Sequence, residues 1–175
     1  MAVLVTSVAL VSIVRTGPAA RSSRVAELFG GEEGLAVVTH PDRVEAFRLD
    51  PTDKPPGGSR LNYPVTSGPI AVPGALMETL TSALTSDRSY AWNFAVACVP
   101  SYGVRLSFYQ GQRRVDVLLC RNCCMLLALH HGVEVGVAQF NPMQAVLVDA
   151  AKKLFPDDPA IQSLSREGGK YVHGL

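Results

Sequence analysis

The amino-acid sequence predicts an α+β fold: an antiparallel sheet of about five to seven strands with two or three packing helices. Two observations favour this class. Short apolar or alternating runs follow one another between residues 90 and 138, separated by turns. The clearest helical pattern comes after them, at residues 143–154. Strands in a row followed by a helix indicate antiparallel pairing, because parallel strands need a long crossover between them.

In the N-terminal half of the domain, the sequence predicts a helix, a hairpin and a loop. A Ser cap, an apolar pattern and a double-Gly stop predict a short helix over residues 22–29. Residues 35–39 and the alternating residues 43–49 predict two strands, which we expect to pair as a hairpin. Residues 50–60 are rich in Pro and Gly and predict an exposed loop.

In the C-terminal half, the sequence predicts a helix, a series of strands and a second helix. A Pro-led amphipathic pattern predicts a helix over residues 73–87, after extended pieces at 63–65 and 70–72. An Asn-Pro cap begins a helix over residues 143–154, and a last helical turn is expected at residues 159–164. Strands are predicted at residues 90–98, 104–109, 114–120, 123–129 and 133–138.

Length and charge exclude some classes of function. The chain has 175 residues, with 16 Lys and Arg against 15 Asp and Glu. This length suffices for one domain with its own core. The charges are balanced in every segment, which argues against a nucleic-acid-binding module because such a module concentrates basic residues on one face. We expect no nucleic-acid partner, and instead an unknown protein or small molecule.

The N-terminal segment allows two interpretations. Residues 2–14 carry no charge and have the length of the apolar part of an export signal, too short for a comfortable bilayer span. Their β-branched content favours a buried strand instead. We assign residues 1–20 to an export segment or a buried strand, 21–165 to one α+β domain and 166–175 to a flexible tail. Membrane contact is expected only through the N-terminal segment.

The four cysteines carry the most distinctive chemistry of the sequence. Cys120 and Cys123 form a CxxC motif between two strand-like runs, so their thiols are expected to flank a tight turn. Four interpretations stay open: a structural disulfide, reduced core thiols, a metal site and a redox site. The simplest disulfide joins Cys98 with Cys120 or Cys123. Adjacent Cys123 and Cys124 are expected to point to opposite faces of a strand, which favours at least one of them remaining outside a disulfide.

A zinc site is the metal interpretation of this motif. A CxxC at a turn resembles half of a zinc knuckle, in which two thiolates bind one ion. A thioredoxin-type CxxC would instead open a helix. The candidate ligands are Cys98, Cys120 and Cys123 with His130, or His131 in its place. A second CxxC or an HxxxH motif, which would make the zinc signal strong, is missing. We expect no cofactor apart from this possible zinc.

No catalytic motif is present. The sequence lacks GxSxG, GxxxxGK[ST], GxGxxG and HExxH, so it assigns no catalytic or cofactor-binding residue. The histidines are scattered, and we interpret each as a solvated surface residue. Asp116, a single acid within an apolar strand, is interpreted as an exposed or hydrogen-bonded structural residue. Trp92 and its aromatic neighbours are expected to pack on the core.

The middle of the chain resembles a family of uncharacterised bacterial proteins, many of which look exported or lipid-anchored. The resemblance lies in Cys98-Val99-Pro100, Tyr-Gly-Val-Arg at 102–105, and Val-Asp-Val-Leu-Leu-Cys at 115–120 followed by a second Cys. A Leu-Phe-Pro-Asp-Asp segment at 154–158 is similar as well. The likeness covers roughly residues 90–160.

The family resemblance implies an exported setting and a linked role for Cys98, Cys120 and Cys123, and it implies no known activity. The chain departs from the family pattern at Arg121, where an aromatic residue is common, and at the extra Cys124.

Two functional hypotheses follow from the sequence. The first is a non-catalytic α+β module, exported or envelope-associated rather than cytoplasmic, whose cysteines cross-link the sheet and whose surface binds a partner. The second is a thiol-dependent site, structural zinc or a redox-active CxxC, formed by Cys98, Cys120 and Cys123. The sequence leaves open whether the protein is an enzyme.

Overall fold

The computed structural model describes residues 23–52, 63–93, 99–120 and 123–167, which contain five α-helices and six strands. The helices are α1 (Arg24–Leu28), α2 (Glu32–Thr39), α3 (Gly74–Leu84), α4 (Gln144–Leu154) and α5 (Pro159–Gln162). The strands are β1 (Arg43–Leu49), β2 (Val65–Ala71), β3 (Tyr102–Gln110), β4 (Arg113–Cys120), β5 (Met125–His130) and β6 (Val133–Gln139).

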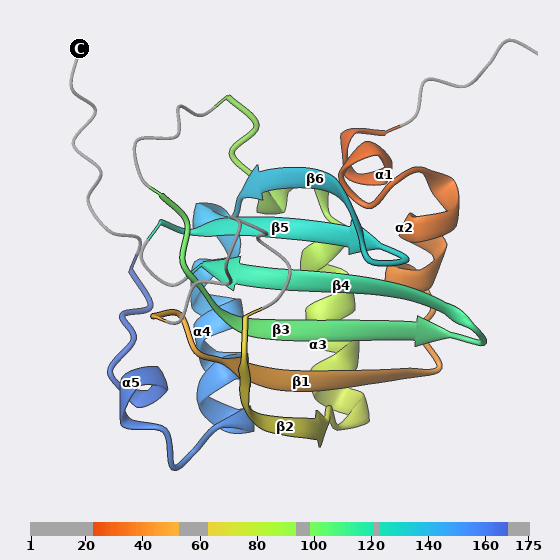
Figure 1. The fold of residues 1–175 in the computed structure, drawn as a ribbon. Coiled ribbons are helices and arrows are strands. Elements are labelled where there is room, and N and C mark those ends of the chain that lie inside the picture. The colour runs from red at the N-terminus through yellow and green to blue at the C-terminus, as the bar shows by residue number, and fades with distance from the viewer. Residues whose placement is uncertain (1–22, 53–62, 94–98, 121–122, 168–175) are drawn as a thin grey trace, which may run out of the picture.

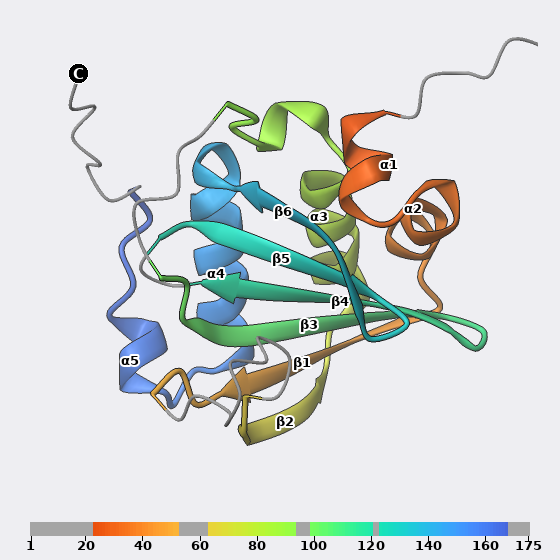
Figure 2. The same ribbon diagram turned by 45° about the horizontal axis from the view of Figure 1, so that its top comes forward.

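The six strands form one antiparallel sheet in the order β2-β1-β3-β4-β5-β6. Helices α3 and α4 lie across one face of this sheet, and α1 and α2 pack near β6 and β4 (Figures 1 and 2). The strand order and the helices on one side confirm the predicted α+β class. Five α-helices are present where we expected two or three to pack, and two of them, α1 and α5, are only 5 and 4 residues long.

Local signals explain the elements that were predicted well. The Ser23 hydroxyl accepts a hydrogen bond from the Ala26 N–H at 3.0 Å and so caps α1. β1 covers the residues predicted from strict alternation. α4 follows a single 3-10 turn (Asn141–Met143), and Lys152 and Lys153 lie in its last turn, where cations complement the helix dipole.

The prediction of a strand at residues 35–39 was wrong. These residues belong to α2, which begins with Glu32 and Glu33 and buries Val37 and Val38 against the sheet. The predicted hairpin with β1 is therefore absent, and β1 pairs with β2 and β3 instead. The β-branched run favoured a strand by propensity. Burial of one helical side against β3 and β4 outweighs that preference.

Side chains on the two faces of the sheet fill two apolar clusters. The face toward the helices, called the helix face, carries the larger cluster, with Phe108, Val117 and Leu126 at its centre. The opposite face, called the second face, carries Leu118 and Leu127. The second-face cluster consists of Leu49, Tyr63, Tyr102, Leu118, Cys120, Cys123, Met125, Leu127 and Leu129. Alternation along β4 and β5 therefore distributes apolar residues to both faces.

Some expectations fall at the edge of the described ranges. In the segment predicted as a strand at residues 90–98, Ala91 makes a single bridge to Gln139, and residues 94–98 lie outside the described residues. Residues 1–22 lie outside them too, and with them the expected export segment or buried strand. Within the described ranges, no helix combines the length and the apolar character that a bilayer crossing needs.

Candidate functional site

The end of the sheet where β4 finishes and β5 begins, called the cysteine end, holds a disulfide between Cys120 and Cys123. The two Cα atoms are 5.8 Å apart, within the usual range for a disulfide. Both residues are buried, with 1% and 2% of their surface exposed. The turn after β4 thus brings the two thiols together, as the CxxC spacing predicted. Their partners differ from the simplest prediction, which paired one of them with Cys98.

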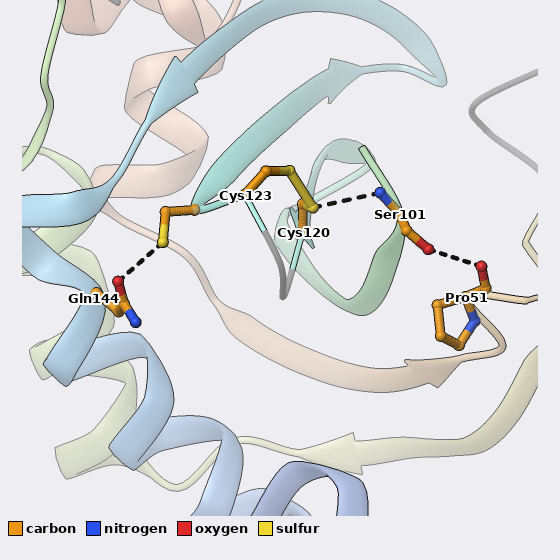
Figure 3. The surroundings of a disulfide bond; sticks show 6 residues. Pro51, Ser101, Cys120, Cys123 and Gln144 are labelled. Carbon is orange, nitrogen blue, oxygen red and sulfur yellow. Dashed lines mark hydrogen bonds between the residues drawn. A yellow bond between two sulfur atoms is a disulfide. The ribbon is translucent and has the colours of Figure 1, made fainter. Parts of the chain in front are cut away.

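The loop before β3 supports this disulfide from one side. The Ser101 N–H donates a hydrogen bond to the Cys120 sulfur at 3.3 Å, and the Ser101 hydroxyl donates to the Pro51 carbonyl at 2.7 Å. Figure 3 shows Ser101 and Pro51 on one side of the disulfide and Gln144 on the other. The loop that precedes β3 therefore bonds the disulfide, while the start of α4 bonds the neighbouring Cys124.

Gln144 links the cysteine end to the C-terminal segment. The Cys124 thiol donates to Gln144 Oε1 at 2.9 Å, while Gln144 Nε2 donates to the carbonyls of Ser165 and Glu167 at 3.0 and 2.9 Å. Cys124 belongs to the helix-face cluster and Cys123 to the second face, as alternation predicted.

The beginning of the expected flexible tail is held in place. Residues 166–175 were predicted to be flexible, yet the Glu167 carbonyl accepts a hydrogen bond from Gln144 and Arg166 pairs with Asp149 at 3.0 Å. Residues 168–175 lie outside the described ranges. The chain is therefore attached to α4 at least to residue 167.

Replacing Gln144 with Leu is expected to detach residues 163–167 from α4. Leu has a similar size but no amide, so the two bonds to backbone carbonyls are lost and the unfolding free energy falls by about 1–2 kcal/mol. Amide hydrogen exchange is expected to rise at residues 163–167 and to stay unchanged in β3 and β4. The matched control is Gln162→Leu, whose amide bonds carbonyls at the end of α4 instead. Equal protection of residues 163–167 in both variants would contradict this role.

A cavity of about 210 Å³ lies beneath α4 at the cysteine end. Its wall is mainly apolar, and the sulfur-bearing residues Cys120 and Cys124 line it together with Gln144 and Arg48. This volume is below the ~300 Å³ at which pockets for drug-sized ligands begin, so it fits a smaller molecule. The apolar wall comes chiefly from Val104, Leu119, Phe140, Leu147, Val148 and Ile161.

Arg48, which lines the cavity, forms a partly buried ion pair with Asp158 at the start of α5. Arg48 Nε donates to Asp158 Oδ2 at 2.6 Å, and Arg48 Nη1 donates to the carbonyls of Leu49 and Gly103 at 2.6 and 2.8 Å. Asp158 Oδ1 accepts from the Ile161 N–H at 3.0 Å and so caps α5. Burial raises the pKa of Asp158, but the hydrogen bonds from Arg48 and Ile161 outweigh it, so the net shift is downward.

Among the described residues, the candidate zinc ligands from the sequence do not lie together. Cys120 and Cys123 are joined to each other, and a metal binds thiolates rather than disulfide sulfurs. His130 lies at the opposite end of β5, a strand of 6 residues, so roughly 17 Å separates it from the disulfide. Cys98, the remaining candidate, lies outside the described residues.

Asp116 and Trp92 have the structural roles that the sequence predicted. Asp116 is buried, accepts a hydrogen bond from the Ser107 hydroxyl at 2.6 Å and pairs with Arg114 at 2.8 Å. It is therefore the hydrogen-bonded alternative that the sequence allowed. Trp92 packs against the core beside Tyr90, with ring centroids 4.9 Å apart.

Sequence reasoning missed one cluster of ionisable side chains. Glu33, His130 and His131 each place a potential ligand atom within 4.8 Å of the others. Burial lowers the pKa of His130, and the neighbouring His131 lowers it further, while Glu33 raises it. The adjacent histidines were visible in the sequence, but Glu33 lies far from them along the chain, so no spacing rule connected the three.

Comparison of the chain with known protein families, curated protein sequences and solved structures gave no significant match.

Proposed function

We propose that this protein is a non-catalytic binding module, exported or envelope-associated, with a cysteine-cross-linked sheet whose cavity beneath α4 takes a small and mainly apolar molecule. The cavity at the cysteine end carries the proposal, because Cys120 of the disulfide, the C-terminal segment and the Arg48 side chain all line it.

The character of the cavity wall supports binding rather than catalysis. The Gln144 amide accepts a hydrogen bond from the Cys124 thiol and donates to two carbonyls. The Arg48 guanidinium donates to Asp158 and to two backbone carbonyls. These polar groups already have partners, so they shape the cavity. Among the described lining residues no histidine stands beside a thiol or hydroxyl, the pairing that activates a nucleophile.

The disulfide supports an exported setting. Disulfides persist in oxidising compartments and are rare in the cytosol, where thiols are kept reduced. The sequence resemblance to exported or lipid-anchored bacterial proteins points the same way. Intact mass measured without reductant tests this part of the proposal. Protein recovered from its native compartment is expected to weigh two hydrogen atoms less than the reduced chain for the Cys120–Cys123 pair, and recovery in fully reduced form would contradict export.

Filling the cavity tests the binding part of the proposal. Ala151 is buried on α4 and lines the cavity, so Ala151→Leu adds three methyl-sized groups inside it. Benzene is the probe, because it is apolar and small and enters enclosed apolar cavities of proteins. We expect benzene to shift the NMR signals of the methyl groups of Leu119 and Val148 in the wild type, and the shifts to weaken at least tenfold in Ala151→Leu.

The matched control is Ala75→Leu, because Ala75 is exposed on α3 and lies outside this cavity. It is expected to bind benzene as the wild type does. Benzene shifts that are absent from the wild type, or equal in both variants, would contradict a ligand cavity beneath α4.

A further inference from the structure

Two neighbouring histidines and a glutamate meet at the turn between β5 and β6, far from the cysteine end. His130 is the last residue of β5, His131 stands in the turn, and Glu33 lies in the first turn of α2. One nitrogen of each imidazole and one carboxylate oxygen lie within 4.8 Å of one another. The fold therefore converges three potential metal ligands at a point that has no part in the cavity.

The backbone of the turn holds the two imidazoles together. His131 has a φ of 51° and Gly132 a φ of 78°, the left-handed pair of a two-residue hairpin turn. Asn or Gly is the usual residue at the first of these positions. Here a His occupies it, and its ring stacks on that of His130 with centroids 4.4 Å apart and planes 27° apart.

Within the part of the chain that the structure describes, one ring nitrogen of His130 has no hydrogen-bond partner. Its Nε2 atom is shielded from solvent and is not bonded to any group in the described part of the chain. Most shielded polar atoms in proteins are paired, and one that is not indicates a missing water, ion or other ligand. This observation is independent of the proximity of the three side chains.

The corner between α1 and α2 is shaped to hold the His130 ring. A Cβ atom added at Gly30 would lie 3.3 Å from His130 Nδ1, and one added at Gly34 would lie 3.5 Å from it. Gly34 also has no space for a Cβ, which would lie 1.8 Å from the Phe29 carbonyl oxygen. Two glycines thus let the imidazole lie directly against the backbone beside Glu33.

We propose that Glu33, His130 and His131 form a binding site for a divalent transition metal of the Zn²⁺ type, which joins α2 to the β5–β6 turn. Imidazole nitrogens and a carboxylate oxygen suit such a metal at about 2.0–2.2 Å. Ligand atoms around a tetrahedral ion are then about 3.3 Å apart. Glu33 and His131 are exposed, so their side chains can move closer than 4.8 Å. The His131 ring also turns out of its stack on His130 when the metal binds, because an imidazole binds a metal in the plane of its own ring.

The coordination has a chemical consequence. Three protein ligands leave the fourth tetrahedral position to water, because the exposed side of the site faces solvent. The metal connects elements distant in sequence, so it binds the folded chain and raises the unfolding temperature.

Titration calorimetry with Zn²⁺ alone tests this site, after the full chain has been treated with a chelator and at a pH above the ordinary imidazole pKa of about 6.5. The variants are Glu33→Gln, which keeps the shape of the side chain, and His131→Asn, which suits the left-handed turn and removes the imidazole. We expect the wild type to bind one Zn²⁺ per chain and both variants to bind at least tenfold more weakly.

His40→Asn is the matched control, because His40 is an exposed histidine outside the cluster. It is expected to bind Zn²⁺ as the wild type does. Circular dichroism without metal checks that each variant is folded, and added Zn²⁺ is expected to raise the unfolding temperature of the wild type and of His40→Asn alone.

Co²⁺ in place of Zn²⁺ separates this site from the cysteines. A site of two imidazoles and a carboxylate gives cobalt d–d absorption without the sulfur-to-cobalt charge-transfer band of a thiolate site. A charge-transfer band, no Zn²⁺ binding by the wild type, or equal binding by His131→Asn and His40→Asn would overturn the proposal.

Discussion

Replacing Asp158 with Asn is expected to lower the free energy of unfolding by about 2 kcal/mol at neutral pH. Arg48 is 9% exposed, and its Nε–H then faces a neutral amide in place of a carboxylate. The Asp158 side chain is 23% exposed and Arg48 keeps its bonds to two carbonyls, so the change removes one charge-assisted hydrogen bond, which contributes about 1.5–3 kcal/mol. Asn is also a good cap for α5, so this change isolates the ion pair from the capping bond. Urea unfolding measures the difference.

Asp149→Asn is the control for the loss of a negative charge. Asp149 pairs with Arg166 at 3.0 Å, but the two side chains are 42% and 65% exposed. Exposed pairs contribute about 0–1 kcal/mol. A loss of similar size in both variants would show that net charge, and not the Arg48–Asp158 pair, determines the effect.

The lowered pKa of Asp158 determines how the stability difference between the wild type and Asp158→Asn changes with pH. The folded-state pKa of Asp158 lies below its ordinary value of 3.8. The stabilisation from its ionised form is therefore complete above about pH 4 and is lost as the pH falls through the folded-state pKa. We expect the difference between the wild type and Asp158→Asn to be constant near neutral pH and to shrink as the pH falls below 4. A difference that stays the same at low pH would contradict the ion-pair explanation.

Periodicity in the sequence predicted much of the fold, because the helical and strand spacings are set by residues that are close along the chain. β1 matches the predicted residues 43–49, and α4 follows the helical spacing of residues 143–154. The strands from β3 to β6 lie where apolar runs separated by turns predicted them. The prediction of a strand at residues 35–39 was wrong because the β-branched run reflects only local propensity, whereas the helix is stabilised by packing of α2 on β3 and β4.

The sites depend on contacts between distant residues, which local patterns do not contain. Arg48 and Asp158 are separated by 110 positions, and Gln144 reaches residues 165 and 167 across the end of α4. Glu33 meets His130 because α2 packs beside the β5–β6 turn. The CxxC spacing was the one local signal that indicated a site, since Cys120 and Cys123 are close enough along the chain for a turn to join them.

Removing the Cys120–Cys123 disulfide with the double variant Cys120→Ala/Cys123→Ala is expected to lower the free energy of unfolding by about 2–3 kcal/mol. The sequence separation of 3 closes a loop of four residues, for which the loss of unfolded-state entropy gives about 2 kcal/mol. Both sulfurs are buried in the second-face cluster, so their removal also leaves small voids. Urea unfolding with and without reductant measures the effect, and the double variant is expected to be insensitive to reductant.

Single cysteine variants identify the disulfide partners. Cys124→Ser keeps a hydrogen-bond donor for Gln144 and is expected to remain sensitive to reductant, because Cys124 is not a member of the pair. Cys98→Ala is expected to remain sensitive as well. If Cys98→Ala instead abolishes the response to reductant, the partner of Cys120 or Cys123 is Cys98, as the sequence first indicated. Reductant sensitivity of the Cys98→Ala variant therefore decides between the Cys120–Cys123 pairing and a pairing that includes Cys98.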